Sequence, residues 1–512
     1  MNDTVDLLII GGGINGVGIA RDAAGRGLSV VLAEQNDLAS STSSASTKLF
    51  HGGLRYLEYF EIGLVRKALI EREVLLSAMP HISWPMRFVL PLSPDMRFDS
   101  DTLTSRLLRF TMPWLRGRRP AWLIRLGLFL YDHLGGRKIL PGTTRLNLTK
   151  TPEGTPLKPH LTRAYEYSDC WVQDSRLVVL NARDAQNRGA HIRPRTRVVA
   201  ATPGENGWQV TLQSSDEVRI VHARAVVNAA GPWVADVIAN VLNQPTRNAI
   251  RLVRGSHIIT RRLYDHDKCY FFQGPDGRIV FAIPYEQDFT LIGTTDVDHP
   301  DPDTPPRCSE DEIDYLCDFT ARYFAQPVTP DDVVSTYSGT RPLFDDGASS
   351  ASAATRDYVL DFNESTGAPL LNVFGGKITT YRKLAEEALD ALKPIFPALP
   401  GDWTAGVPLP GGDFPVNGVD RLIADFRAAN PWADAKTAQR LIRAYGTEAQ
   451  TIFVDGPGNH FGHGLYEAEI NWLIAREWVQ TTDDLLWRRT KLGLRFTEDE
   501  TKALANYITA RR

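Results

Sequence analysis

The sequence has few cysteines, no long apolar run and no excess of charge of one sign, and each absence excludes a class of protein. Its four cysteines form no Cys-x-x-Cys pair and have no His-rich partner spacing, which argues against a disulfide scaffold and a metal site. The N-terminus lacks the basic start and longer apolar core of a secretory signal. No stretch of about 18 uncharged apolar residues is present to span a bilayer. We therefore expect a reduced protein that faces the cytoplasm.

The charge balance excludes a protein that is basic overall. Lys and Arg total 57 and Asp and Glu total 61, so the formal net charge is −4. A globally basic nucleic-acid binder is therefore not expected, although local basic patches remain open. Hydrophobic residues make up 43% and charged residues 23%, which is typical of globular proteins. A length of 512 residues predicts two or more structural units.

The first 34 residues predict a nucleotide-binding unit. Residues 5–10 read as an apolar strand, 14–25 as a helix and 28–34 as a second strand, with Gly11-x-Gly13-x-x-Gly16 at the first turn. The first glycine makes the turn, the second lets the backbone approach a pyrophosphate, and the third lets helix and strand pack closely. The helix N-terminus, at Ile14 and Asn15, supplies N–H donors. This is the opening βαβ unit of a dinucleotide fold.

Glu34 closes the second strand, where its carboxylate can accept hydrogen bonds from the adenosine ribose and disfavours NADP. The turn and Glu34 do not separate FAD from NAD, but two other features favour flavin. The glycine motif occurs once, so no separate nicotinamide domain is expected. Glycine-bearing strand ends recur at Gly231 and at Gly375-Gly376, as a long flavin nucleotide lying across one fold would need.

The remaining pattern predicts a β-rich middle and a helical end. A polar joint at 286–288 suggests a hairpin, and 419–512 shows almost no strand pattern. Residues 86–140 are irregular, and 397–412 read as a linker. The further strands are predicted at 225–231, 256–260, 278–283, 290–293 and 370–376, and a helix at 378–392.

Residues 42–58, TSSASTKLFHGGLRYLE, resemble the signature of FAD-dependent glycerol-3-phosphate dehydrogenases, in particular the bacterial aerobic, respiratory enzymes. The resemblance covers essentially the whole chain. One mild departure is Thr340, where the family often has an aliphatic residue. Further matching segments are 167–172, 255–258, 292–296, 337–343, 355–358, 374–382, 466–469 and 484–491.

The resemblance implies an α/β fold with a Rossmann-like FAD-binding domain of the D-amino-acid-oxidase type. An antiparallel-sheet substrate domain would be interleaved with it, and a helical C-terminal domain would follow. The implied segments are 1–85, 161–250 and 346–396 for FAD binding, 86–160 for the substrate and membrane interface, 251–345 for the substrate-domain sheet, and 413–512 for the helical domain.

The implied activity is oxidation of sn-glycerol 3-phosphate to dihydroxyacetone phosphate. Hydride would pass from C2 to N5 of a noncovalent FAD, and electrons would pass to a membrane quinone of the ubiquinone type. The alternatives are an oxidase that uses O2, a non-catalytic or tRNA-modifying FAD protein, and an enzyme like the amino-acid oxidases. The extra insertion of the oxidase relatives is not found between Arg251 and Arg382, which favours the dehydrogenase.

Residues from the glycine turn and from the matching segments are the predicted FAD contacts. A Ser/Thr-rich loop by itself is usually solvated, but the resemblance favours cofactor contact for this one. The predicted contacts are Gly11, Gly13, Ile14, Asn15, Gly16, Glu34, Thr42, Ser43, Ser46, Lys48, His51, Gly52, Gly53, Gly231, Gly376 and Thr379.

A small phosphate dianion calls for fixed cations, and the planar fork of arginine matches phosphate geometry. By resemblance, Arg341 and Arg356 would hold phosphate, while Arg55, Tyr56 and Lys377 would line the substrate and flavin. We also expect Arg341, Arg55 and Lys377 to act in catalysis. Lys377, at a strand-to-helix turn, would stabilise the anionic reduced ring, unless it only begins a helix.

The reaction needs a base for the C2 hydroxyl. His257, in a predicted strand, is the first candidate because neutral imidazole can take a proton near pH 7, and His51 is the second. A lone histidine in a strand is more often a hydrogen-bonded core residue, so both assignments stay open.

Residues 106–138 contain eight basic residues and one acid, Asp132, among aromatic and aliphatic side chains. This mixture suits the surface of an anionic membrane, although a solvated helix face or nucleic acid could use it too. Since a quinone reductant must reach the bilayer, we expect peripheral contact with the cytoplasmic face of the cell membrane and no nucleic acid. Tryptophans in the C-terminal helices suit core packing or a subunit contact, so a homodimer is possible.

Overall fold

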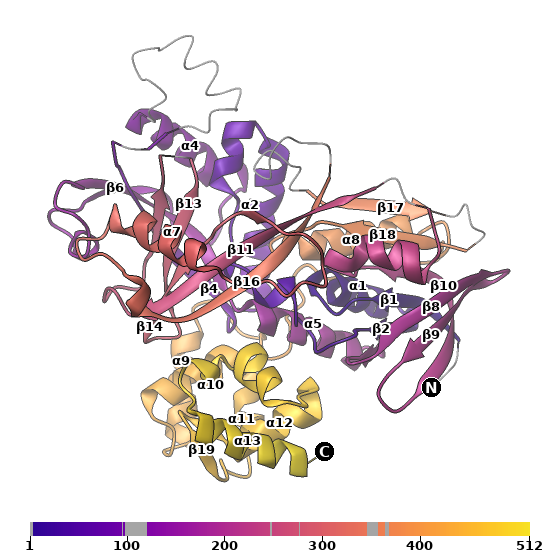
Figure 1. The fold of residues 1–512 in the computed structure, drawn as a ribbon. Coiled ribbons are helices and arrows are strands. Elements are labelled where there is room, and N and C mark those ends of the chain that lie inside the picture. The colour runs from indigo at the N-terminus through magenta and orange to yellow at the C-terminus, as the bar shows by residue number, and fades with distance from the viewer. Residues whose placement is uncertain are drawn as a thin grey trace.

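The computed structural model describes residues 4–94, 96–97, 120–245, 248–275, 277–345, 357–363 and 368–511. Two large sheets form the upper part of the molecule, and a helical unit made by the last hundred residues lies below them (Figure 1). Among the described residues, no helix is both long and apolar enough to cross a membrane.

The first sheet contains the predicted nucleotide-binding unit. β1 (Thr4–Ile10), the helix α1 (Ile14–Gly25) and β2 (Val30–Ala33) confirm the predicted strand, helix and second strand. The strand order is β17-β18-β10-β1-β2-β7, with β8 and β9 as an antiparallel extension of β10. The other strands are β7 (His191–Arg193), β8 (Arg197–Gly204), β9 (Gly207–Gln213), β10 (Val218–Asn228), β17 (Val359–Asn363) and β18 (Leu370–Phe374).

Burial on both faces explains the apolar run of β1. Leu7 and Ile9 pack on one side with α1, α5 (Asp174–Asn187) and α8 (Tyr381–Ala391), and Leu8 packs on the other side under β8 and β9. Continuous apolar strands are typical of parallel sheets covered on both faces. Because β1, β2, β10 and β18 are parallel, their carboxyl ends meet at one edge, where ligands bind in such sheets.

The second sheet has ten strands and is antiparallel apart from the pair β4–β12. The polar joint at 286–288 connects β13 to β14, so the predicted hairpin is confirmed. The strands are β3 (Leu49–Phe50), β4 (Ser83–Pro91), β5 (Thr144–Asn147), β6 (Arg163–Val172), β11 (Ile250–Arg261), β12 (Cys269–Gln273), β13 (Ile279–Tyr285), β14 (Phe289–Gly293), β15 (Val297–Asp298) and β16 (Val333–Phe344).

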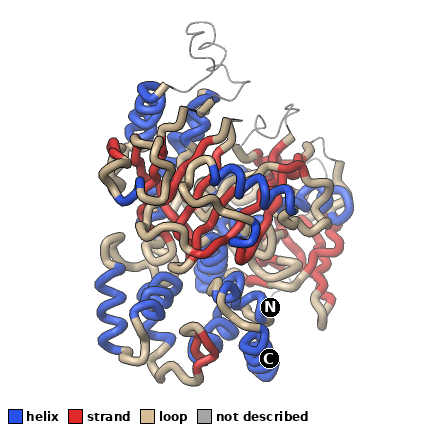
Figure 2. The backbone as a smooth tube through the Cα atoms, turned by 60° about the vertical axis from the view of Figure 1, so that its left-hand side comes forward, coloured by secondary structure: helices blue, strands red, loops and turns tan. Residues whose placement is uncertain are grey.

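Helices cover both faces of the second sheet, as Figure 2 shows for its red strands and blue helices. Ile259 and Phe271 pack toward α2 (Ile62–Ala78) and α4 (Ala121–Leu134), whereas Ile258 and Phe272 pack toward α7 (Glu310–Ala321). Neighbouring residues of a strand point to opposite faces, which explains this division.

The C-terminal unit has its own apolar core, around Phe426, Leu441 and Leu473. Its helical character confirms the prediction, although it also contains a short hairpin of β19 (His460–Gly462) and β20 (Leu465–Tyr466). Its helices are α9 (Val419–Ala429), α10 (Ala435–Tyr445), α11 (Ala449–Ile452), α12 (Glu467–Glu477), the π-helix η9 (Asp484–Arg489) and α13 (Glu498–Ala510).

Short helical turns connect these elements. They are η1 (Thr42–Ser44), η2 (Leu54–Tyr59), η4 (Pro152–Gly154), η5 (Gly231–Trp233), α6 (Val234–Asp236), η6 (Val237–Val241), η7 (Pro330–Asp332), η8 (Gly446–Glu448) and η10 (Leu492–Leu494). α8 begins at Tyr381 rather than at 378, because residues 375–380 form a turn. The expected irregular region, 86–140, contains α4 and the end of β4.

The chain passes between the two sheets more often than the predicted segments imply. β3 lies within the expected FAD-binding segment 1–85 and β6 within 161–250, yet the two pair with each other in the second sheet. The reason is that β6 leads directly into α5, which packs on the first sheet, so the chain changes sheets at residue 173.

Candidate active site

A long groove crosses the carboxyl edge of the first sheet and continues between the two sheets. One part has a volume of about 380 Å³ and lies beside the glycine turn, and the other has about 310 Å³ and lies beneath β13 and β16. The two parts share a wall, so they form one elongated site. The shared residues are Ile14, Thr42, Ser43, Pro342, Gly375 and Gly376.

The turn after β1 has no room for side chains. A Cβ added at Gly16 would lie 2.0 Å from the carbonyl oxygen of Gly11, and one added at Gly11 would lie 2.5 Å from the carbonyl oxygen of Ala229. Gly11 also has φ +111°, in the region that favours glycine. Gly16 therefore acts behind the turn and does not line the groove, whereas Gly11 and Gly13 do.

The N-terminus of α1 points into the middle of the groove and is held there by other segments. The Ile14 N–H donates to Oγ of Ser43 at 3.0 Å, and Nδ2 of Asn15 donates to the Gly375 carbonyl at 3.0 Å. Oδ1 of Asn15 is buried without a hydrogen-bond partner. Orphan N–H groups and the positive end of the helix dipole make this a site for a pyrophosphate.

Glu34 stands at the end of β2, on the wall of the larger cavity. Its carboxylate accepts from the N–H groups of Gly12 and Asn36, each at 2.7 Å. Burial raises the pKa of the Glu34 carboxyl, while these two N–H groups oppose that change. Gly231, at the end of β10, lies on the same wall.

The loop after β2 divides into residues that face the groove and residues that support it. Thr42 and Ser46 line the groove, and Oγ1 of Thr42 donates to the Thr340 carbonyl at 2.6 Å. Lys48 lies outside both cavities, because its ammonium binds the Asp174 carboxylate at 2.9 and 3.0 Å. Burial alone would raise the pKa of the Asp174 carboxyl, but the Lys48 charge outweighs it and lowers that pKa.

The segment His51-Gly52-Gly53 is also split. His51 and Gly53 line the smaller cavity, and Gly53 has φ +74°. Gly52 lies behind the wall, where an added Cβ would meet the side chain of Leu69 at 2.4 Å. The Gly52 N–H donates to the Tyr131 hydroxyl at 2.7 Å, which fixes the backbone of the segment.

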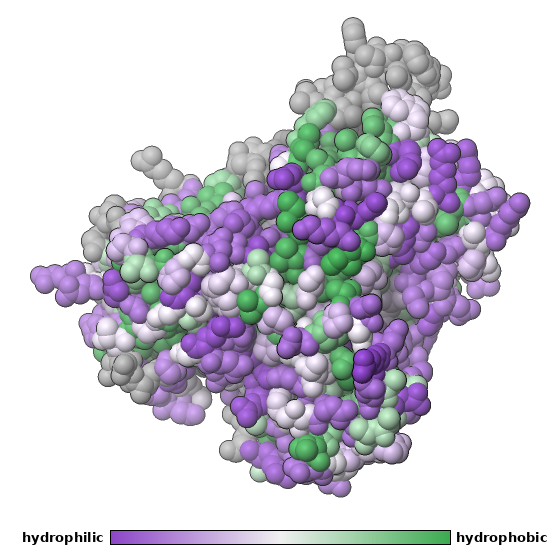
Figure 3. Space-filling model, turned by 180° about the vertical axis from the view of Figure 1, so that it is seen from behind, coloured by the Kyte–Doolittle hydropathy of each residue, from purple (hydrophilic) through white to green (hydrophobic). Residues whose placement is uncertain are grey.

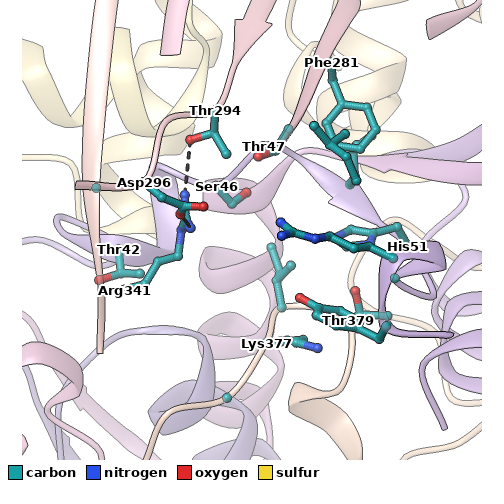
Figure 4. A pocket seen from close by; sticks show the side chains of 18 of the residues that line it. Thr42, Ser46, Thr47, His51, Phe281, Thr294, Asp296, Arg341, Lys377 and Thr379 are labelled. Carbon is teal, nitrogen blue, oxygen red and sulfur yellow. Dashed lines mark hydrogen bonds and ion pairs between the residues drawn. The ribbon is translucent and has the colours of Figure 1, made fainter. Parts of the chain in front are cut away.

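Arg341 lies on one side of the smaller cavity, at the end of the groove opposite Glu34. Its guanidinium pairs with Asp296, and Nη2 donates to Oγ1 of Thr294 at 3.2 Å and to the Thr295 carbonyl at 3.1 Å (Figure 4). A Cβ at Gly255 would lie 2.0 Å from Nη2, so the arginine packs directly on the backbone of β11.

Across the cavity from Arg341 lie His51 and Lys377 (Figure 4). Lys377 and Thr379 come from the turn between β18 and α8, and the Lys377 ammonium lies 4.0 Å from the ring centroid of Tyr56. Arg55 and Tyr56 line the same cavity from η2, and so does Arg278, next to β13. The cavity therefore has cations on several of its walls.

Two histidines line this cavity and both are held neutral at pH 7. His257 is 2% exposed, its Nε2 lies 3.0 Å from Oγ1 of Thr47, and its buried Nδ1 has no hydrogen-bond partner. Burial, with the charges of Lys48 and Arg341, holds the pKa of His257 well below its ordinary value. Burial and the charges of Lys377 and Arg72 lower the pKa of His51 to about 4.

Comparison with known proteins identifies the family of the chain. The FAD-dependent oxidoreductase family matches residues 6–382, and the C-terminal domain of alpha-glycerophosphate oxidase matches residues 403–510. A glycerol-3-phosphate dehydrogenase of Pseudomonas aeruginosa is 47% identical over 99% of this chain and 95% of its own. The chain belongs to the family of FAD-dependent glycerol-3-phosphate dehydrogenases.

Two further related proteins extend this comparison. The glycerol-3-phosphate dehydrogenase of Bacillus halodurans, solved as a complex with FAD, has a TM-score of 0.73 and 25% identity, over 99% of this chain and 94% of that one. The D-erythritol 1-phosphate dehydrogenase of Brucella abortus is 51% identical over 99% of this chain and 98% of its own. The family's cofactor, FAD, is thus the cofactor of this chain.

The groove suits FAD in shape and in chemistry. Its larger part would offer Glu34 to a ribose, the glycine turn and α1 would offer N–H donors to a pyrophosphate, and the smaller part adds a volume of about 310 Å³ beside them. Most of the predicted contacts line it. Gly16, Lys48 and Gly52 lie behind its walls, where they shape or support the residues that do. Arg356 lies outside the described residues.

Sequence reasoning assigned no role to Asp296, Thr294 or Arg278, all of which line the substrate end. The first two lie in the segment Ile292–Asp296, which the resemblance had singled out, so a signal for them existed. Arg278 begins a predicted strand in which Ile279 and Phe281 face the cavity. The alternation of side chains along this strand places Arg278 on the opposite face from Ile279 and Phe281, so it did not predict that Arg278 would line the same cavity.

The close approach at Gly16 gives a testable prediction. Gly16→Ala places a methyl group against the Gly11 carbonyl, so the turn must open and FAD binding should fall at least tenfold. The ratio of flavin to protein absorbance in the purified protein measures this. Gly63→Ala, in α2 with nothing within 4 Å of the added Cβ, is the control. Retention of full FAD by Gly16→Ala would contradict the assignment of the turn.

Proposed function

We propose that the chain oxidises sn-glycerol 3-phosphate to dihydroxyacetone phosphate and passes the electrons to a membrane quinone. The observation that carries this proposal is one cavity with several cations, two neutral histidines and the turn that bears Lys377, adjoining the nucleotide end of the groove. The relatives named for glycerol 3-phosphate, which match nearly the full chain, support the substrate.

In this proposal the phosphate binds to guanidinium and ammonium groups. Arg341 is pre-oriented by Thr294 and Asp296, so that little side-chain entropy is lost when an anion binds. Arg55 and Lys377 approach from the other side of the cavity. A phosphate bound by these cations would bring the hydroxyl-bearing carbons into the cavity that the histidines also line.

His51 takes the proton of the C2 hydroxyl in this proposal, although His257 is the first candidate from sequence. His257 is 2% exposed, its Nδ1 is buried, and its Nε2 is engaged by Thr47. His51 is partly exposed and lies among the residues that line the substrate end. A histidine that is neutral at pH 7 has a lone pair available to accept a proton.

FAD bound in the groove would supply the acceptor for the hydride from C2, its N5 atom. Lys377 lies beside the site, where its ammonium group would stabilise negative charge that develops during the transfer. Loss of the hydroxyl proton to His51 and of the hydride from C2 leaves the ketone of dihydroxyacetone phosphate, so protons and electrons balance.

A second substrate is favoured by one specific observation, the 51% identity to a D-erythritol 1-phosphate dehydrogenase. This compound shares the phosphate and a neighbouring secondary hydroxyl and adds one more hydroxymethylene group. The same cations and the same base would serve both, so the choice depends on the room beyond the reacting carbon.

Anaerobic titration of the purified protein distinguishes these substrates. We expect sn-glycerol 3-phosphate to bleach the visible absorbance of the flavin, whereas glycerol and lactate, which lack the phosphate, should not. For each substrate, the rate constant of bleaching is divided by the apparent Kd. A higher ratio for D-erythritol 1-phosphate than for sn-glycerol 3-phosphate would assign the chain to the second substrate. Absence of bleaching by both would refute the proposed reaction. Rapid formation of peroxide on admission of air would indicate the oxidase.

The role of Arg341 predicts a division between substrate and cofactor. Arg341→Ala should raise the KM for the phosphate substrate tenfold to a hundredfold, since a charged hydrogen bond contributes about 1.5–3 kcal/mol. The Kd for FAD should change by less than about threefold. Arg341→Lys keeps the positive charge but loses the planar guanidinium, so its KM for the phosphate substrate should lie between the values for the unaltered protein and for Arg341→Ala. An equal loss of substrate and FAD binding would point to a folding role instead.

An exposed apolar face on α4 supports the proposed membrane contact. Trp122, Leu126, Phe129 and Leu130 are 43–53% exposed on one side of this helix, while Leu128 and Tyr131 are buried beneath it. Figure 3 shows hydrophobic residues, in green, gathered in the upper part of the molecule, the part in which Figure 1 labels α4. Arg125 and Lys138 lie nearby, and the basic residues at 106–119 lie outside the described residues. This face is suited to the surface of an anionic bilayer.

Vesicle binding tests that contact. Phe129→Glu should reduce co-sedimentation with vesicles of phosphatidylethanolamine and phosphatidylglycerol at least tenfold, because a carboxylate opposes both burial in lipid and the anionic surface. Val454→Glu, at a side chain 76% exposed in the C-terminal unit, is the matched control. Equal binding by both variants would exclude α4 as the contact.

A further inference from the structure

The C-terminal helical unit contacts the turn that forms the adenosine end of the FAD groove. This turn follows β2, and five of its residues line the larger cavity: Glu34, Gln35, Asn36, Ala39 and Ser40. Asp37 lies in the same turn but is directed away from the groove, with its side chain 1% exposed. Nothing in the proposed reaction uses this buried carboxylate.

Two arginines of the C-terminal unit bind Asp37. Arg489 donates to both carboxylate oxygens, at 2.8 and 2.9 Å, and Arg488 donates through Nε at 2.6 Å. The Arg489 side chain is fully buried and also donates to the Glu477 carbonyl at 2.7 Å. Both arginines belong to η9, more than 450 residues from Asp37, within the matching segment 484–491 that had no assigned role.

A second connection supports the same turn from the other side. Nη2 of Arg195 donates to the Asp484 carboxylate at 2.7 and 2.9 Å, and the backbone N–H of Arg195 donates to the Asn36 carbonyl at 2.8 Å. The next N–H, of Thr196, donates to the Glu34 carbonyl at 2.7 Å. Burial would raise the pKa of the Asp484 carboxyl, but the Gln480 N–H, the charges of Arg195 and Arg488 and a hydrogen bond from Thr481 lower it to about 2. The Asp484 carboxylate is therefore ionised at neutral pH.

We propose that Arg489 and Arg488 are positioning residues for FAD, through which the C-terminal unit completes the cofactor site. By binding Asp37 they hold the turn in the shape in which Glu34 and the backbone of 35–36 face the ribose. Leu38 and Ala39 of this turn pack into the apolar core, whereas the polar residues 34–37 before them are held by hydrogen bonds and ion pairs. FAD affinity would then depend on a structural unit that does not itself line the groove.

The contrasting possibility is that these arginines only join the two units. In that case all buried ion pairs across the junction should affect FAD binding alike. Arg183 of α5 binds Glu448 of the C-terminal unit at 2.7 and 2.8 Å, and neither residue lines the groove. Glu448→Gln is therefore a matched control that weakens the junction and leaves the turn unchanged.

The test measures FAD binding to the full-length apoprotein by quenching of flavin fluorescence. Arg489→Met should raise the Kd for FAD at least tenfold, Arg489→Lys should restore part of the loss, and Glu448→Gln should stay within twofold of the unaltered protein. ADP, which carries only the adenosine end, should lose affinity in Arg489→Met by the same factor as FAD. Once saturated with FAD, Arg489→Met should be reduced by substrate at the unaltered rate.

Two results would overturn the proposal. One is an equal rise in Kd for Arg489→Met and Glu448→Gln, and the other is a normal Kd in a folded Arg489→Met protein. If Arg489→Met fails to fold, Arg488→Met serves instead, because Arg488 is 18% exposed and its loss leaves the Arg489 bonds to Asp37 in place. We expect a threefold to tenfold rise in Kd for it, and an unchanged Kd would equally reject the proposal.

Discussion

The close approach of backbone to backbone at the start of α1 is the constraint on which the structure depends. No side chain fits between Gly11 and Gly16, or between Gly11 and Ala229, so β1, α1 and β10 meet without intervening atoms. This contact places the N-terminus of α1 at the carboxyl edge of the sheet. The proposed pyrophosphate and ribose contacts and the path of the groove are all located relative to it.

The rest of the site is assembled from segments that are distant in sequence but joined by short polar contacts. Ser43 accepts from the backbone of α1, Asn15 donates to the turn before Lys377, and Thr42 donates to β16 one residue before Arg341. These bonds connect the loops directly, so the walls of the groove are mutually oriented by the protein itself. Such preorganisation lowers the entropic cost of binding a long ligand.

Charge at the substrate end is concentrated but partly compensated. Arg341 has Asp296 as a partner, and Arg72, behind the wall, has Asp169. A cavity with uncompensated buried cations would be costly to fold, while one with full compensation would not attract a dianion. Burial lowers the pKa of both nearby histidines, and Arg72 beside His51 and Arg341 beside His257 lower it further, because a positive charge disfavours a protonated imidazole.

Features that depend on neighbours along the chain could be predicted from the sequence. These are the βαβ unit with its glycine turn and Glu34, the hairpin at 286–288, the helical C-terminal unit, and the family with its cofactor. Other features became clear from the three-dimensional structure alone. β6 belongs to the second sheet although α5, which follows it, packs on the first. Lys48 binds Asp174, and Asp296 orients Arg341. The contact between Arg489 and Asp37 is likewise visible only in the folded structure. The physical reason is that periodicity and turn chemistry act over a few residues, whereas these pairs form only when two packed sheets and a helical unit bring distant segments together.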